Sequence, residues 1–489
     1  MTFSSARLVV AAALVATALA LTAPQAATAQ YDAPDPGGNE SAFAGVPPQG
    51  KLFGMNDSIV DFSNGQSPNS YASYVESIGG TAIRTILDWA WAEPFEQDQL
   101  SEVRFQKWRD VYDAAKRHGL RPIFLLASAP FWARGDQSDF SRSCQVCPFP
   151  PADNATMNAE WGEYVAEIAR RFPDAIIQVW NEANLHYWWG FQNPDPERYA
   201  ELADIAYDAV QQVELQVGHD IPVIAPGLAN VPDEEEVAQR MSLRRFLERA
   251  YAAPTPLDEN IDGLATNAFP HSLNFGAGGL LAETFQDIRE EQDQAGDDSP
   301  IWVTETGIQG GFGFPWDEVT RAQADLRLYN RLTSIPDVAA VLFHRIIEPV
   351  ENDPFNAFEF SLAWLHYVQP PQPQTQADPA PPKPVYCMFT QLARDFYAPC
   401  LEVTITDGPK RKTKKSSARF EFQLYPEAWL AATECSLDGS RYKPCQSGKS
   451  YRGLDPGKHS FKVRGRDGTG KTGRPDTHKF TVKKKKKKN

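Results

Sequence analysis

With 489 residues, the chain is too long for one ordinary compact core, which predicts at least two domains. A hydrophobic fraction of 42% is that of a globular protein and argues against a disordered or a membrane-embedded chain. Residues 401–489 hold 23 Lys+Arg against 9 Asp+Glu, although the overall net charge is −15. The chain therefore has an acidic main part and a basic C-terminal module. The acidic main part argues against nucleic-acid binding.

Residues 1–29 differ in composition from the rest of the chain. Arg7 precedes the apolar run LVVAAALVATALALTA, and Ala27, Thr28 and Ala29 form a small-x-small cleavage site before Gln30. This is the pattern of a secretory signal peptide, whereas the alternative, an uncleaved membrane anchor, requires a longer apolar run. We therefore expect a secreted, soluble, extracellular protein in which the Pro/Gly/Ser-containing residues 30–50 form a linker.

Apolar runs alternate with amphipathic helical patterns between residues 51 and 400. The runs lie at 51–56, 81–87, 121–127, 175–180, 221–227, 261–269, 300–305 and 338–345. Continuous apolar strands are typical of parallel sheets buried on both faces, and eight β-then-α units predict an α/β fold, a (β/α)8 TIM barrel with inserted loops. An open doubly wound sheet is the alternative, but KLFGMNDS (51–58) lacks a glycine-rich phosphate turn after its strand.

The pattern changes after residue 400. The Pro/Gln-rich segment 369–384 predicts an exposed loop before the last barrel helix. From residue 401 to 482, short alternating strands such as ARFEFQL and HSFKVRGRD are separated by turns such as LDG and DPG, which predicts a small all-β sandwich. Residues 483–489 form a poly-Lys tail.

Six cysteines fall into three local pairs. They are Cys144 and Cys147, Cys387 and Cys400, and Cys435 and Cys445. An even number fits an oxidising compartment, and we expect three disulfides. The C-x-x-C pair would also suit a redox or zinc site, but no second ligand pair of matching spacing accompanies it, which favours a loop-pinning disulfide and no metal or cofactor.

Two glutamates end apolar strands. Glu182 follows the fourth run in IIQVWNEAN, and Glu305 ends the seventh in IWVTETG. Barrel enzymes keep their chemistry at the carboxyl ends of the strands, so both carboxyls are expected in one crevice, as glycosidic bond cleavage requires. A separation of about 5 Å is expected if the cleavage is a double displacement. A strand-end acid that merely meets solvent or an arginine is the alternative for either residue alone.

These motifs resemble clan A of the retaining glycoside hydrolases, whose acids follow strands 4 and 7, with families 39 and 5 most similar. The resemblance covers residues 51–400 and implies that Glu182 is the acid/base and Glu305 the nucleophile. It implies that Asn181 binds the sugar 2-hydroxyl and that Arg84 lies beside Glu305, where a cation keeps the carboxylate ionised. A structural salt bridge is the alternative role for Arg84.

The chain departs from the clan pattern in two places. After strand 6 the clan often has His-x-Tyr, whose hydroxyl bonds the nucleophile, whereas this chain has Asn267 and Phe269, with His271 as a replacement partner. After strand 8 the clan commonly has a tryptophan below the sugar, whereas here Phe343 and His344 occupy that stretch. Both changes put recognition of the first sugar in doubt.

Aromatic residues follow several strands, where they could stack on sugar rings, although any single one could serve packing instead. The candidates at the expected rim are Trp89, Trp91, Trp132, Trp188, Trp189 and Trp316. As a set they predict an extended saccharide groove.

The C-terminal segment ECSLDGSRYKPCQSGKSYRGLDPG resembles the Ig-like repeats appended to bacterial secreted proteins, in which a pair like Cys435 and Cys445 staples a hairpin. The lysine tail is expected either to attach the protein to an anionic cell-wall or membrane surface, or to be a solvated spacer.

The sequence therefore predicts a monomeric, secreted retaining glycoside hydrolase that cleaves a β-linked poly- or oligosaccharide by double displacement. A non-catalytic carbohydrate-binding protein on the same barrel and a transglycosylase are the alternatives.

Overall fold

The computed structural model describes residues 50–56, 67–144, 147–270, 279–308, 318–344, 402–425, 430–467, 472–473 and 475–484. The predicted signal peptide, the 369–384 loop, His271, Trp316 and most of the lysine tail lie outside these residues. Within the described part, no helix is long and apolar enough to cross a membrane.

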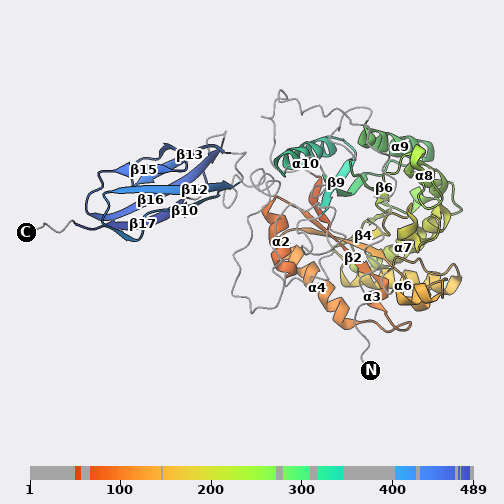
Figure 1. Ribbon diagram of the computed structural model, residues 1–489. Coiled ribbons are helices and arrows are strands. Elements are labelled where there is room, and N and C mark those ends of the chain that lie inside the picture. Colours follow the sequence, from red (N-terminus) through yellow and green to blue (C-terminus); the bar gives the residue numbers. More distant parts are fainter. Residues whose placement is uncertain are drawn as a thin grey trace, which may run out of the picture.

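The N-terminal sheet is a barrel of parallel strands (Figure 1). Its strands are β1 (Leu52–Asn56), β2 (Ala82–Asp88), β3 (Arg121–Ala127), β4 (Ile176–Val179), β5 (Val223–Ile224), β6 (Leu228–Ala229), β7 (Leu264–Asn267), β8 (Ile301–Thr306) and β9 (Val338–His344). They are ordered β5-β4-β3-β2-β1-β9-β8-β7-β6, and every pairing is parallel.

Nine strand labels correspond to eight strands because β5 and β6 are two parts of the fifth, interrupted by Ala225, Pro226 and Gly227. Proline removes a ladder hydrogen bond, which explains the interruption. β5, the first part, pairs with β4. It also forms a bridge from Ile224 to Gly263, in the chain that leads into β7. β6, the second part, pairs with β7, so the sheet closes into a barrel. The predicted (β/α)8 barrel is confirmed.

Helices follow the strands and surround the barrel (Figure 1). They are α2 (Pro68–Ser77), α3 (Trp89–Ala92), α4 (Glu102–Arg117), α5 (Asp139–Ser143), α6 (Ala155–Arg171), α7 (Pro196–Val217), α8 (Leu243–Tyr251), α9 (Leu280–Ala295) and α10 (Glu318–Thr333). Sequence signals explain their ends: Asn154, Asp195 and Ser242 cap the first turns of α6, α7 and α8 with side-chain oxygens. Gly218 and Gly296 end α7 and α9 in the left-handed conformation.

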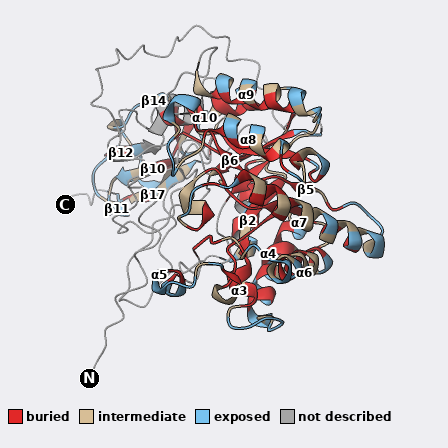
Figure 2. Cartoon of the chain, turned by 90° about the vertical axis from the view of Figure 1, so that its right-hand side faces the viewer, coloured by how far each residue is buried: buried red, intermediate tan, exposed pale blue. Residues whose placement is uncertain are grey.

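Two apolar layers hold the barrel together, and Figure 2 shows buried residues concentrated at the sheet and on the inner helix faces. The outer layer packs helices against strands and includes Trp108, Trp161 and Phe172. The inner layer fills the barrel with one residue from most strands and three from β9. Its members are Leu52, Ala82, Ile123, Ile176, Ile224, Ala265, Trp302, Ala339, Ala340 and Leu342.

The described residues between Glu402 and Val482 form the predicted β-sandwich. A three-stranded sheet, β10-β12-β15, comprises β10 (Glu402–Asp407), β12 (Ser417–Tyr425) and β15 (Lys449–Arg452). A five-stranded sheet, β11-β17-β16-β13-β14, comprises β11 (Lys412–Thr413), β17 (Asp476–Val482), β16 (Gly457–Asp467), β13 (Leu430–Leu437) and β14 (Lys443–Cys445). Phe420 of the first sheet stacks on Phe461 of the second, with ring centroids 3.9 Å apart. The Ig-like assignment stays a prediction.

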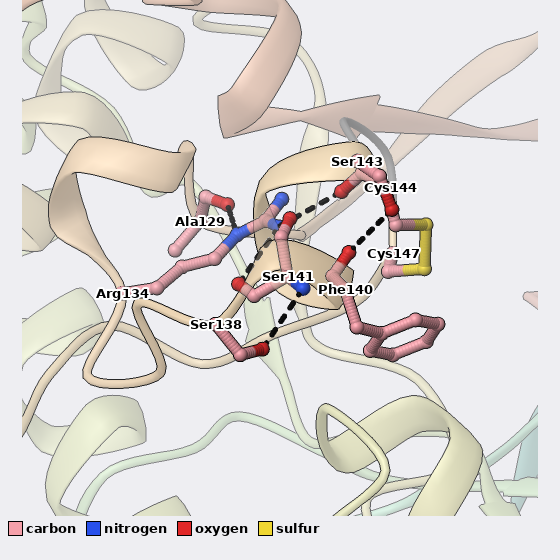
Figure 3. The surroundings of a disulfide bond; sticks show 8 residues. All are labelled: Ala129, Arg134, Ser138, Phe140, Ser141, Ser143, Cys144 and Cys147. Carbon is pink, nitrogen blue, oxygen red and sulfur yellow. Dashed lines mark hydrogen bonds between the residues drawn. A yellow bond between two sulfur atoms is a disulfide. The ribbon is translucent and has the colours of Figure 1, made fainter.

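The C-x-x-C pair forms the predicted loop-pinning disulfide between Cys144 and Cys147, at the end of α5 (Figure 3). Beside it the buried guanidinium of Arg134 donates to the carbonyl oxygens of Ala129 (2.7 Å), Ser141 (2.7 Å) and Cys144 (2.8 Å). The disulfide and the cation thus hold one loop after β3 closed. The redox and zinc alternatives are not needed to explain this pair.

Cys435 and Cys445 also form a disulfide, which joins the paired strands β13 and β14 as predicted. Cys387 and Cys400 lie outside the described residues, so their pairing stays a prediction. Every cysteine in the described part is disulfide-bonded, which fits the expected oxidising compartment.

We expect Gly227→Ala to destabilise the barrel. A Cβ at this position would lie closer than 3.0 Å to Asn267 Oδ1 and Thr304 Oγ1, both buried inside the barrel. Overpacking of this kind costs about 1–3 kcal/mol of unfolding free energy, measurable by urea denaturation. Gly135→Ala is the matched control, because its Cβ would meet only Ala152 at 3.8 Å. Equal stability of the two variants would contradict the prediction.

Candidate active site

A polar layer lies directly above the apolar filling of the barrel, two residues further along several strands. Ala82 is followed by Arg84, Ile176 by Gln178, Ala265 by Asn267, Trp302 by Thr304, and Leu342 by His344. Because side chains alternate along a strand, residues two apart point to the same side. This layer therefore forms the floor of a site at the carboxyl ends of the strands.

The guanidinium of Arg84 is the centre of this layer and is 1% exposed. It donates to Glu305 Oε1 (2.7 Å), Asn181 Oδ1 (2.8 Å), Gln178 Oε1 (2.5 Å) and Asn56 Oδ1 (2.5 Å). Its partners come from β1, β4, the end of β4 and β8. A buried cation is stable only when paired and hydrogen-bonded, and Arg84 meets both conditions. Arg84 thus lies beside Glu305, as the sequence led us to expect.

A β-bulge in β8 aims Glu305 into the site. Thr266 pairs with Val303, but the next residue of β7, Asn267, pairs with Glu305, so β8 carries one extra residue. In a regular strand, consecutive residues face opposite sides, and Glu305 would face the helices because Thr304 faces inward. The bulge breaks this alternation, which places Glu305 against Arg84.

The end of β4 is also irregular. Trp180 (φ 68°) and Glu182 (φ 38°) have left-handed backbones, which residues other than glycine rarely adopt. Such strain persists only where surrounding contacts impose it, and it concentrates at functional sites. Here the contacts are the Trp180 Nε1 bond to Trp188 O (2.6 Å) and the Glu182 N bond to Gly227 O (3.1 Å). The distortion lets both Asn181 and Glu182 face the barrel mouth.

Asn267 joins Glu182 to the rest of the layer. Its Nδ2 donates to Glu182 Oε1 (3.1 Å) and to Asn181 Oδ1 (3.2 Å). Its Oδ1 accepts from Thr304 Oγ1 (2.9 Å), which fixes the orientation of the amide. A continuous chain of hydrogen bonds therefore runs from Glu305 through Arg84, Asn181 and Asn267 to Glu182.

The environment raises the pKa of Glu182 to about 7. Burial is the largest cause, and the charge of Glu305 raises the pKa further. Asn267, Arg84 and Trp188 oppose this increase, because each stabilises the ionised carboxylate. A carboxyl group that keeps its proton near neutral pH is suited to act as a general acid.

His344 is a second neighbour of Glu305. Its Nδ1 lies 3.6 Å from Glu305 Oε2 and 2.9 Å from Asn56 Nδ2, and its ring meets the edge of Phe269. His344 therefore approaches the carboxylate oxygen of Glu305 that is not bonded to Arg84. His271, the replacement partner that the sequence suggested for the clan tyrosine, lies outside the described residues.

Two predicted binding residues do not reach the site. Trp89 is completely buried, and its ring stacks on Tyr164 at a centroid distance of 5.7 Å, which leaves no face for a sugar. Phe343 is 1% exposed and packs against Phe53 on the outer side of the barrel. Consecutive residues of a strand face opposite sides, so Phe343 faces away from the mouth when His344 points inward. We therefore withdraw both from the binding set.

Of the remaining rim tryptophans, Trp189 is 2% exposed and is also withdrawn, whereas Trp91, Trp132 and Trp188 remain partly exposed. Trp188 lies in the short helical turn His186–Trp189 after β4. Its side chain lowers the pKa of Glu182, because it stabilises the ionised carboxylate. Trp132 donates from Nε1 to Glu93 O (2.9 Å) and meets the edge of Trp89. All three stay predictions as sugar-binding residues.

Gln178, Thr304 and Asn56 were not foreseen as site residues. The available signal was the presence of a polar residue within an otherwise apolar strand, as in IIQV and IWVTE. Buried polar groups need hydrogen-bond partners, so such residues indicate a polar network inside the barrel. Asn267 was noticed only as a departure from the clan pattern.

In the part of the chain that the structure describes, one group of acids approaches closely enough to hold a metal ion. Asp98, Glu160 and Glu163 bring carboxylate oxygens within 4.8 Å of one another, away from the Arg84 network. Asp98 and Glu163 are exposed, and Glu160 accepts a hydrogen bond from Gln97. Exposed acids of this kind are common without a metal, and we assign none.

Comparison with known proteins gives matches in structure only. No protein-family model and no curated protein matches the chain. A family 39 glycoside hydrolase from the gut symbiont Bacteroides cellulosilyticus WH2 aligns over 85% of this chain and 72% of its own, with 16% identity and a TM-score of 0.49. An endo-beta-1,4-mannanase from Thermotoga petrophila aligns over 90% and 99%, with 13% identity and a TM-score of 0.45. Because these identities and TM-scores are low, the barrel is assigned from the strand pairing of this chain alone.

We expect Glu182 to make stability depend on pH. Its folded-state pKa of about 7 exceeds the ordinary value of 4.5, so the folded protein keeps a proton that the unfolded chain releases. Unfolding free energy should therefore fall between pH 4.5 and 7, relative to Glu182→Gln, by up to about 1.4 kcal/mol per pH unit. Urea denaturation across this range measures the difference.

The control for this titration is Glu248→Gln, an exposed glutamate on α8. Its stability difference from the parent protein should not change with pH in the same interval. A difference between the parent protein and Glu182→Gln that is constant with pH would show that Glu182 has an ordinary pKa.

Proposed function

We propose that this protein is a retaining glycoside hydrolase that cleaves a β-linked poly- or oligosaccharide. The observation that carries the proposal is the hydrogen-bonded chain that holds Glu305 against the Arg84 guanidinium and Glu182 against Asn267 at one end of the barrel. Two carboxyl groups at one site, one of them with a pKa raised to about 7, suit glycoside hydrolysis. The motifs WNEAN and WVTETG, which resemble clan A, support the same assignment.

In the first step, Glu305 attacks the anomeric carbon while Glu182 gives its proton to the departing oxygen. Glu305 is the nucleophile because the Arg84 guanidinium, 2.7 Å away, holds its carboxylate in place at the end of β8. Glu182 can act as the acid because its pKa is raised to about 7. The products are the released alcohol and a glycosyl ester of Glu305.

In the second step, Glu182 takes a proton from water as the water attacks the ester. Forming the ester removes the negative charge of Glu305, which is one cause of the raised pKa of Glu182. The pKa of Glu182 therefore falls in the intermediate, and the same residue becomes a base. Double displacement requires the carboxyls to lie about 5 Å apart, and that spacing stays a prediction.

Asn181 is proposed to bind the 2-hydroxyl of the sugar. Its Oδ1 is occupied by Arg84 and Asn267, and no described residue accepts from its Nδ2. The amide is therefore held in one orientation, with a donor left for substrate. Trp188 and Trp132 are proposed as stacking surfaces for further sugars.

We also propose that the protein is exported as a monomer and meets its polysaccharide outside the cell, without a cofactor. The signal-peptide pattern of residues 1–29 and the two disulfides support export. Transglycosylation differs only in the acceptor that attacks the ester, and it is distinguished by analysis of the products.

Replacement of the nucleophile separates catalysis from binding. We expect Glu305→Gln to lower kcat by at least about 10⁴-fold, because the covalent intermediate can no longer form, with Kd for the same glycan changed by less than about tenfold. A glycan hydrolysis screen identifies the substrate, and calorimetry on the variant measures binding. If the parent protein binds glycans and cleaves none, it is a carbohydrate-binding protein and the proposal is wrong.

Replacement of the acid should have an effect that depends on the leaving group. With Glu182→Gln, cleavage of the natural glycan should slow by about 10²–10⁴-fold, while a dinitrophenyl glycoside, whose leaving group needs no proton, should still form the glycosyl ester in a rapid burst. In the parent protein, cleavage should fall as the pH rises through about 7, since Glu182 then loses its proton. This fall should vanish in the variant, but not in Glu248→Gln.

A further inference from the structure

The outer face of the five-stranded sheet in the sandwich carries a group of lysines. Phe461, Val463 and Phe480 are buried between the sheets, so the residues that alternate with them face outward. By register, Lys458 lies beside Thr481, Ser460 beside Lys479, and Lys462 beside Thr477. Lys412 of β11 lies on the other side of Thr481. We call Lys412, Lys458, Lys462 and Lys479 the lysine face.

The four members of the lysine face are exposed, and no described carboxylate forms an ion pair with any of them. The register places one carboxylate on the outer side of the described part of this sheet, Glu434, which accepts from Arg464 (2.8 Å) and approaches Arg466 (3.4 Å). That carboxylate is therefore already neutralised within the sheet. The lysine face therefore keeps a concentrated positive charge that no described carboxylate of the chain neutralises.

The lysine face is continuous with the tail. β17 ends at Val482, and the backbone N–H of Lys483 still donates to Thr413 O (2.8 Å) at the edge of β11. The row of Lys412, Thr481 and Lys458 is thus the last row before the chain enters the run Lys483–Lys488. Lys483, the first residue of the tail, therefore directly follows the lysine face along the chain.

The residues between the lysines favour a polysaccharide over a membrane. Ser460, Thr477 and Thr481 place hydroxyl groups between the cations. The large exposed apolar side chains of the described chain are Phe95, Val103, Phe140, Leu215 and Val237, and all lie outside the sandwich. A membrane-bound surface typically inserts apolar side chains, whereas hydroxyls and spaced cations suit the hydroxyls and carboxylates of an acidic glycan.

We propose that the lysine face docks a carboxylate-bearing polysaccharide. Strands lie about 4.8 Å apart and residues rise about 3.4 Å, so Lys412 and Lys458 are separated by about 10 Å and Lys458 and Lys462 by about 13 Å. A polymer with repeated negative charges can meet several of these cations at once, and individually weak contacts then add to useful affinity. The docking rests on the proposed function only in that an exported glycan hydrolase encounters such polymers.

The test measures binding of the full-length mature chain to immobilised alginate, a carboxylate-bearing polysaccharide. The face variant is Lys458→Gln/Lys462→Gln/Lys479→Gln. The matched control, Lys443→Gln/Lys449→Gln/Arg452→Gln, removes the same charge from β14 and β15. We expect the face variant to bind about tenfold more weakly, the control to stay within about twofold, and parent binding to weaken as salt rises from 0.05 to about 0.5 M.

Four results would overturn the docking. The first is an equal loss of alginate binding in the two triple variants. The second is full binding by the face variant together with loss of binding when the tail lysines are replaced by glutamine. The third is tighter binding to phosphatidylglycerol vesicles than to alginate, and the fourth is equal binding to neutral dextran. Thermal unfolding of each variant verifies that it is folded. Because the readout is binding and not hydrolysis, this result is independent of the Glu305→Gln experiment.

Discussion

The buried Arg84 guanidinium is the interaction on which the site depends. A cation inside a barrel is unfavourable unless acceptors surround it, and here the acceptors are Glu305, Asn181, Gln178 and Asn56. Loss of the cation would remove the donor that these groups share, and loss of any acceptor would leave part of the cation unsatisfied. Mutual satisfaction of this kind holds side chains from several strands in one arrangement, which is the preorganisation that the proposed catalysis would require.

Departures from regular strand geometry decide which side chains meet at this network. The extra residue in β8 turns Glu305 inward, and the left-handed backbones of Trp180 and Glu182 let two consecutive residues face the same mouth. The interrupted fifth strand places Gly227 where a side chain would collide with Asn267. Each distortion costs stability, and the packed helices and apolar filling of the barrel offset that cost.

The sandwich uses charge differently from the barrel. Inside the barrel, one cation is matched by acceptors at fixed positions, and the outcome is a defined geometry and a raised pKa of Glu182. On the five-stranded sheet, four lysines remain exposed without partners in the described residues, and the outcome is a surface for a polyanion. This division follows the opposite charges of the two parts of the sequence.

The sequence by itself determined the barrel, the sandwich and two disulfides, because hydrophobic periodicity and local cysteine spacing act over short distances along the chain. It also located Glu182 and Glu305 at strand ends, since the end of an apolar run can be read directly. Only the tertiary structure decided that Trp89 is buried and that Gln178 belongs to the site. A residue's side of a strand depends on bulges, left-handed backbones and long-range partners, and these arise only when distant segments pack together.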